Sequence, residues 1–163
     1  MQRKHSVFVP VCCVLLMLNG CGGAKKPEGM PPLYPCQITI TQEGKPLADA
    51  VVSLASENNK WQSSAQTDTK GVAELITYGQ FLGVPAGTYK VLVVKRELDG
   101  PPPVSNTDAE GRVLGGPQGQ PSFPKYIERV HPVYSAKESS PLTIEIKPMK
   151  SGNDQTFEVG KSP

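Results

Sequence analysis

Cys21 is the residue whose sequence setting most clearly predicts a chemical reaction. Its thiol directly follows the small residue Gly20, at the end of an apolar run that starts at residue 7 and comes after Arg3 and Lys4. The run is about a dozen residues long, whereas a helix needs about 20 to span a bilayer. Basic residues, a short apolar run and a small residue are typical of a secretory signal. We therefore expect residues 1–20 to be removed, so that Cys21 becomes the N-terminus.

The four residues 18–21 have the sequence Leu-Asn-Gly-Cys, which resembles the bacterial lipobox. The resemblance implies a diacylglyceryl group on the Cys21 thiol and acylation of its amine. Each buried CH₂ group contributes about 0.8 kcal/mol, so two or three chains hold a protein firmly on a membrane. We expect a lipid-anchored protein of the cell envelope, and Gly22 in place of Asp favours the outer membrane over the inner one. An ordinary cleaved signal and an uncleaved anchor are the alternatives.

Removal of the signal also changes the charge and the cysteine content. The chain has 17 Lys and Arg against 15 Asp and Glu, and the loss of Arg3 and Lys4 leaves it formally neutral. Without a basic patch, nucleic acid is excluded as a partner. Of the four cysteines, the first two leave with the signal and Cys21 takes the lipid, so no disulfide forms. The remaining Cys36 shares a strand face with Ile38 and Ile40, which predicts a buried structural thiol.

The rest of the chain shows the two-residue alternation of half-buried strands, and amphipathic helical spacing is missing. We expect an all-β sandwich of about seven strands. The expected strands cover residues 36–41, 49–55, 63–67, 72–77, 88–95, 142–147 and 155–159. Residues 21–33, rich in Gly, Pro and Lys, predict a flexible spacer. Residues 99–124, rich in Pro and Gly, form an insertion of a length found in functional or disordered loops.

Three segments resemble the carboxypeptidase regulatory-like domains. These are residues 44–52 (GKPLADAVV), 67–73 (TDTKGVA) and 84–91 (VPAGTYKV). The resemblance implies a transthyretin-like (prealbumin-like) Greek-key β-sandwich over residues 34–160. Residues 123–126 and 139–146 are similar to the ends of short lipoproteins abundant in planctomycete-type bacteria. Because these are fold motifs, they bring no catalytic residue with them.

Enzymatic chemistry has little support in the residues. Only His131 remains after cleavage, and the chain has no zinc-site spacing and no Gly-x-Ser-x-Gly motif. Residues 68–71 are faintly similar to a calcium loop, but Lys70 stands where an oxygen ligand belongs, which favours a structural turn. We expect no catalysis, no metal and no cofactor. A divergent transthyretin-like hydrolase is the less favoured alternative, since the hydroxyisourate hydrolases need several His and Arg residues and a C-terminal Tyr-Arg-Gly-Ser.

Trp61 is the candidate contact residue for a ligand or partner. It follows the polar residues Asn58 and Asn59 in an expected loop, and an exposed tryptophan can stack on a sugar ring or anchor a protein. The alternative is that Trp61 covers an open edge of the core. Tyr126 could add to such a surface. We expect a non-catalytic binding or structural module with a protein or glycan partner in the envelope, or else an accessory subunit that docks through residues 99–124.

Overall fold

The structure, a computed structural model, describes residues 25–57, 60–100 and 125–163. Within these ranges the chain forms fourteen strands and one short 3-10 helix, η1 (Pro132–Tyr134), and no α-helix. The all-β expectation is therefore confirmed. No helix of the described ranges has the length and apolar character needed to cross a membrane. The expected signal, Cys21 and residues 101–124 of the expected insertion lie outside the described residues, so these expectations remain predictions.

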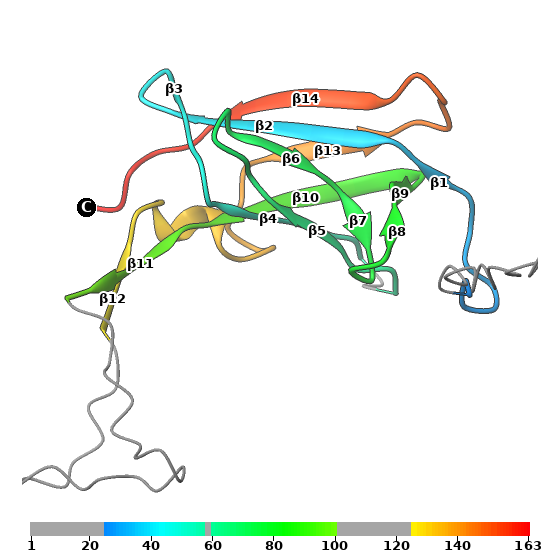
Figure 1. Ribbon diagram of the computed structural model, residues 1–163, viewed down its shortest axis with the longest axis horizontal. Coiled ribbons are helices and arrows are strands. Elements are labelled where there is room, and N and C mark those ends of the chain that lie inside the picture. Colours follow the sequence, from blue (N-terminus) through cyan, green and yellow to red (C-terminus); the bar gives the residue numbers. More distant parts are fainter. Residues whose placement is uncertain (1–24, 58–59, 101–124) are drawn as a thin grey trace, which may run out of the picture.

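Two β-sheets pack face to face (Figure 1). The larger sheet is antiparallel, and its strand order is β13 (Thr143–Ile146), β10 (Gly87–Val94), β4 (Val51–Ala55), β5 (Ser63–Gln66), β7 (Ile76–Thr77) and β8 (Phe81–Leu82). The smaller sheet contains β14 (Asn153–Glu158), β2 (Cys36–Gln42) and β3 (Lys45–Pro46), and β6 (Val72–Glu74) also pairs with β2. β14 and β2 pair in parallel. All seven expected strands are present, with boundaries shifted by a few residues.

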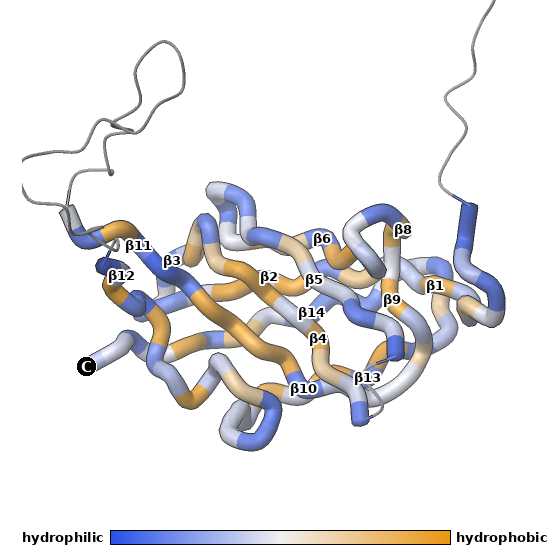
Figure 2. The backbone as a smooth tube through the Cα atoms, turned by 90° about the horizontal axis from the view of Figure 1, so that it is seen from below, coloured by the Kyte–Doolittle hydropathy of each residue, from blue (hydrophilic) through white to orange (hydrophobic). Residues whose placement is uncertain are grey.

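The core lies between the two sheets and is built from every second residue of the strands, as the alternation predicts. Its inward-facing side chains include Cys36, Ile38 and Ile40 of β2, Val52 and Leu54 of β4, Tyr89, Val91 and Val93 of β10, and Ile144 and Ile146 of β13. Figure 2 shows hydrophobic residues gathered in the strands and hydrophilic ones in the connecting loops. Cys36 is 1% exposed, which confirms its predicted burial.

The strand expected over residues 72–77 belongs to both sheets. Its first part, β6, pairs with β2, whereas its second part, β7, pairs with β5. Leu75 lies between them, fully buried. Its N–H donates to the Cys36 carbonyl (3.0 Å), and its carbonyl accepts from the Gly83 N–H (2.9 Å). The backbone therefore stays hydrogen-bonded while it crosses the core, and one apolar segment connects the two layers.

Residues 68–71 form a structural turn, as expected. Asp68 Oδ1 accepts hydrogen bonds from the Lys70 N–H (2.8 Å) and the Val72 N–H (2.9 Å). Gly71 has a φ of +76°, and a Cβ at this position would lie 2.5 Å from the Ile40 carbonyl oxygen. The Gly71 carbonyl in turn accepts from the Ile40 N–H (2.8 Å). The turn therefore packs directly on the β2 backbone, which requires glycine.

Two short strand pairs extend the sandwich at opposite ends (Figure 1). β1 (Leu33–Tyr34) pairs with β9 (Val84–Pro85), and β11 (Arg96–Asp99) pairs with β12 (Lys125–Glu128). The expected spacer, residues 21–33, is therefore one residue too long at its C-terminal end, because Leu33 already lies in a strand. The β11–β12 hairpin continues β10 beyond the core, so it marks the end of the molecule opposite β1 and β9.

We expect Gly71→Ala to lower the free energy of unfolding by about 2–4 kcal/mol, because the new Cβ adds a backbone clash to the cost of a left-handed conformation. Gly44→Ala is the matched control: its φ is +71° and nothing lies within 4 Å of the added Cβ, so it should cost only about 1 kcal/mol. Urea unfolding measures both variants. Equal losses would contradict the packing of this turn on β2.

Candidate binding cleft

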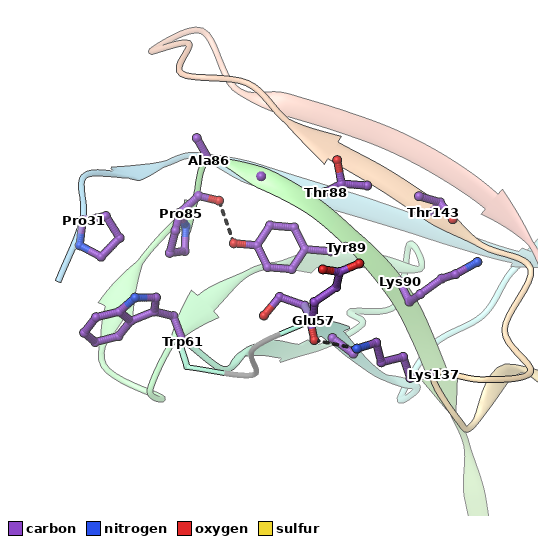
Figure 3. A pocket seen from close by; sticks show the side chains of 13 residues that line it. Pro31, Glu57, Trp61, Pro85, Ala86, Thr88, Tyr89, Lys90, Lys137 and Thr143 are labelled. Atoms are coloured by element: carbon purple, nitrogen blue, oxygen red, sulfur yellow. Dashed lines mark hydrogen bonds between the residues drawn. The ribbon is translucent and has the colours of Figure 1, made fainter.

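An open cleft of about 620 Å³ lies where β10 begins and β4 ends (Figure 3). It is lined by Pro31, Ala55, Ser56, Glu57, Trp61, Pro85, Ala86, Gly87, Thr88, Tyr89, Lys90, Lys137 and Thr143. Its size is within the range of about 300–1,000 Å³ that is typical of small-ligand sites. The cleft therefore includes Trp61, the residue that the sequence singled out, and lies at the same end of the sandwich as the β1–β9 pair.

Trp61 is held in place by the turn between β7 and β8. The rings of Trp61 and Tyr78 are tilted by 57° with centroids 5.5 Å apart, a geometry typical of attractive aromatic pairs. Tyr78 also donates from its hydroxyl to the Lys60 carbonyl (2.5 Å) and from its N–H to the Gln62 carbonyl (2.9 Å). The Lys60 ammonium lies 5.2 Å from the centroid of the Trp61 ring. Tyr78 therefore contacts the residues on both sides of Trp61 as well as the ring itself.

Tyr78 has an unusual backbone conformation. Its φ is +53° and that of the next residue, Gly79, is +68°, while the Gln80 N–H donates to the Thr77 carbonyl (3.3 Å). Two positive φ values in a tight hairpin are typical of a type I′ turn, where Asn and Gly are the usual residues. A tyrosine there costs energy. The contacts with Trp61 and its neighbours explain why this chain tolerates that cost.

The apolar wall of the cleft contains Tyr89, Pro31 and Pro85 (Figure 3). The Tyr89 hydroxyl donates to the Pro85 carbonyl (3.0 Å), which fixes the ring. Burial raises the pKa of Tyr89 above its usual value of 10.0. Because this phenol stays protonated in the neutral pH range, it brings no charge to the cleft, and with 5% of its surface exposed it presents only a small part of its ring there.

The side of the cleft opposite this apolar wall carries charged groups. Lys137 Nζ donates to the Ser56 carbonyl (3.0 Å) at the base of the cleft, and Lys90 Nζ donates to the Ser140 carbonyl (3.1 Å). In Figure 3 the Glu57 carboxylate points into the cleft, whereas the tip of Lys90 points away from it. No ion pair of Glu57 is found within the described parts of the chain. The cleft therefore offers an anionic acceptor and a cationic donor that form no ion pair with each other in the described structure.

Tyr126 lies far from this cleft. It is 58% exposed and pairs with Leu98 in the β11–β12 hairpin. The eight residues of β10, about 25 Å of strand, separate that hairpin from the cleft (Figure 1). The structure does not bring Tyr126 and Trp61 together into one surface. Sequence reasoning also missed Tyr78, whose tight turn with Gly79 is the one signal that could have indicated it.

Neither His131 nor Cys36, the two groups considered for chemistry, is among the residues that line the cleft. His131 Nδ1 accepts from the Val133 N–H (3.2 Å) and caps the short helix η1, which confirms its interpretation as a loop residue. Burial, with a smaller contribution from the Asp154 charge, raises the pKa of Cys36 from 9.0 to about 11. Among the described residues no three His, Cys, Asp or Glu side chains gather as metal ligands would.

We expect the Cys36 thiol of the mature protein to resist Ellman's reagent in the native state and to react fully once guanidinium unfolds the chain, because its thiolate is disfavoured. Since its folded pKa of about 11 exceeds its ordinary 9.0, its contribution to stability is complete below about pH 9 and is lost as the pH rises through about 11. Denaturant unfolding of Cys36→Ala should show a smaller alkaline loss than the parent protein. Fast labelling of the native thiol would contradict this burial.

Comparisons with known proteins identify no family. No protein-family model matches the chain, and no curated protein matches it. Among solved structures, it is similar to the major pilin subunit of Bacillus cereus, with 14% identity, a TM-score of 0.44 and coverage of 80% of this chain and 30% of that one. It is also similar to a 9R-lipoxygenase from Cyanothece, with 14% identity, a TM-score of 0.35 and coverage of 84% of this chain and 18% of that one. The chain therefore spans less than a third of the length of either structure.

Proposed function

We propose that this protein is a lipoprotein of the cell envelope, anchored through Cys21 with the outer membrane favoured, and that its β-sandwich is a non-catalytic binding module. The observation that carries the binding role is the placement of Trp61. This side chain belongs neither to the core nor to the partly buried residues packed against it, and instead lines an open cleft. This placement favours a contact residue over the alternative that Trp61 covers an edge of the core.

For the fold we propose the transthyretin-like Greek-key arrangement of the carboxypeptidase regulatory-like domains. Support comes from the places of the three sequence motifs. Residues 44–52 contain the turn after β2 and the start of β4, residues 67–73 contain the Gly71 turn before β6, and residues 84–91 contain β9 and the first half of β10. All three lie at turn-to-strand junctions, where the residue type is restricted by the backbone.

The proposed anchor places the cleft on the membrane side of the domain. Pro31 lines the cleft and comes ten residues after Cys21 in the sequence. A chain of that length spans at most about 35 Å when fully extended. A ligand of the cleft would therefore be a component of the envelope close to the lipid surface, whereas the β11–β12 hairpin would point away from it.

The alternative is an accessory subunit that docks on a protein through residues 99–124, which connect the two strands of the β11–β12 hairpin. Tyr126 (58% exposed) and Ile127 (39% exposed) favour it, because both apolar side chains face solvent in a projecting element. Exposed ion pairs of Arg96 with Glu128 and of Arg129 with Glu97 link the two sides of the hairpin. No observation favours the hydrolase alternative.

The anchor is tested by replacing Cys21 with serine. We expect the parent chain to incorporate a clickable palmitate analogue and to fractionate with the outer membrane. Cys21→Ser should take up no label and should lose its membrane association, since no thioether can form. Equal membrane recovery of a processed Cys21→Ser chain would contradict the proposal.

The binding role is tested with two matched aromatic substitutions at opposite ends of the domain. After mild crosslinking in intact cells, the full-length protein should retain an envelope component that Trp61→Ala loses and that Tyr126→Ala keeps. Quantitative mass spectrometry and sugar analysis of the purified adducts measure this difference. Loss with Tyr126→Ala alone would overturn the cleft in favour of the accessory-subunit alternative.

A further inference from the structure

We infer that the cleft beside Trp61 binds a neutral saccharide, which stacks on Trp61 and hydrogen-bonds to the polar groups opposite. This inference rests on the binding role proposed above and adds the chemical class of the ligand. It is drawn from three features of the cleft: an aromatic wall, a pair of opposite charges that form no ion pair with each other within the described ranges, and a strained residue that holds the tryptophan.

The aromatic wall suits the apolar face of a sugar ring. Trp61 is the exposed aromatic ring of the cleft lining, while Tyr89, fixed by its hydrogen bond to the Pro85 carbonyl, is 5% exposed and adds a small apolar area beside it. Lys60 and Tyr78 contact Trp61 but do not belong to the cleft lining, so they support the ring from outside. A pyranose presents C–H groups on its faces and hydroxyls around its rim, which matches a wall that is apolar on one side only.

The opposite side supplies the hydrogen-bonding groups that a sugar rim needs. A sugar hydroxyl both donates and accepts, and Glu57 accepts only, while Lys137 donates only. One of the three N–H donors of Lys137 bonds to the Ser56 carbonyl, which leaves two for a ligand. Thr88 and Thr143, on neighbouring strands, are also among the lining residues, but Figure 3 shows their side chains across β10 from Glu57, so Glu57 and Lys137 are the groups that face Trp61. Together these side chains can accept from and donate to the hydroxyls of one sugar.

The same groups disfavour other ligand classes. An acyl chain would place the charges of Glu57 and Lys137 against hydrocarbon, which is costly. A polyanion would meet the Glu57 carboxylate, and a polycation would meet Lys137. A run of consecutive prolines could stack on Trp61, but proline has no N–H, so such a run would offer Glu57 no donor. A neutral polyhydroxyl compound avoids all of these costs.

Tyr78 is a positioning residue in this proposal. Its φ of +53° is kept at an energetic cost, and strained residues of this kind gather at ligand sites. Because it contacts the Trp61 ring and both flanking residues, it orders the stacking surface before a ligand arrives. Pre-ordering of this kind improves affinity by lowering the entropy lost on binding.

The test uses the full-length lipidated protein in a zwitterionic detergent, since sugar-based detergents would compete. The probes are cellobiose, lactose, mannobiose and chitobiose, with cellobiuronic acid and a hexaproline peptide for comparison. The chain contains one tryptophan, so its fluorescence reports on the cleft directly. We expect at least one neutral disaccharide to change this emission in a saturable way and to bind more tightly than the acid or the peptide, with calorimetry giving the dissociation constants.

Four variants separate the hydrogen-bonding role of Glu57 from the positioning role of Tyr78. Glu57→Gln should weaken binding about tenfold, because a charge-assisted hydrogen bond becomes a neutral one. Tyr78→Asn suits the positive φ and keeps the fold, but it should weaken binding and broaden the environment of Trp61, seen as a lower near-ultraviolet circular dichroism signal. Tyr78→Phe keeps the ring contact and should restore most of both readouts. Tyr126→Asn, at the far end, should change neither.

Three results would overturn the inference: no neutral disaccharide of the panel binds, hexaproline binds more tightly than all of them, or Trp61→Ala keeps full affinity in calorimetry. None of these affects the proposed anchor, which fractionation of Cys21→Ser measures independently. A crosslinked partner that needs Trp61, together with silence in the sugar panel, would keep the binding role and reject the saccharide.

Discussion

The burial of one strand, β2, is the constraint on which this fold depends. Its inward residues Cys36, Ile38 and Ile40 are almost fully buried, and the strand pairs with β14, β3 and β6. The Leu75 N–H donates to the Cys36 carbonyl of this strand. Gly71 packs closely against its backbone at Ile40. A strand enclosed in this way has no room for a ligand beside its inward face, and the cleft lies where β10 begins and β4 ends.

The cleft forms at such an end, from segments whose positions the core determines. β10 and β4 are paired over five residues up to Lys90 and Ala55, and beyond this point the two backbones diverge. The loop that leaves β4 carries Glu57 and Trp61, while the start of β10 carries Thr88 and Tyr89. Tyr78, in the turn between β7 and β8, contacts the Trp61 ring from outside the cleft. Groups far apart in sequence thus surround one opening without disturbing the core.

The alternation of apolar residues was enough to predict the all-β class, the seven main strands and the burial of Cys36, because these depend on local spacing. It could not show that the chain changes sheets at Leu75, since a crossing residue is as apolar as a strand residue. Nor could it show that Tyr78 contacts Trp61 across 17 positions of sequence, because this contact depends on strand pairing. Residues such as Cys21, outside the described ranges, are known from the sequence alone.

On the proposed arrangement, the spacer contributes as much to ligand choice as the cleft does. An open cleft with few charged contacts gives weak binding, because much of the ligand stays in water. Attachment to a membrane would compensate for this weak affinity. Many copies of the protein in one plane would bind a polymer of repeated sugar units at high effective concentration. With Cys21 lipidated, the spacer would keep Pro31, and with it this side of the cleft, within about 35 Å of the lipid. Selectivity would then come from where the cleft is held as well as from the side chains that line it.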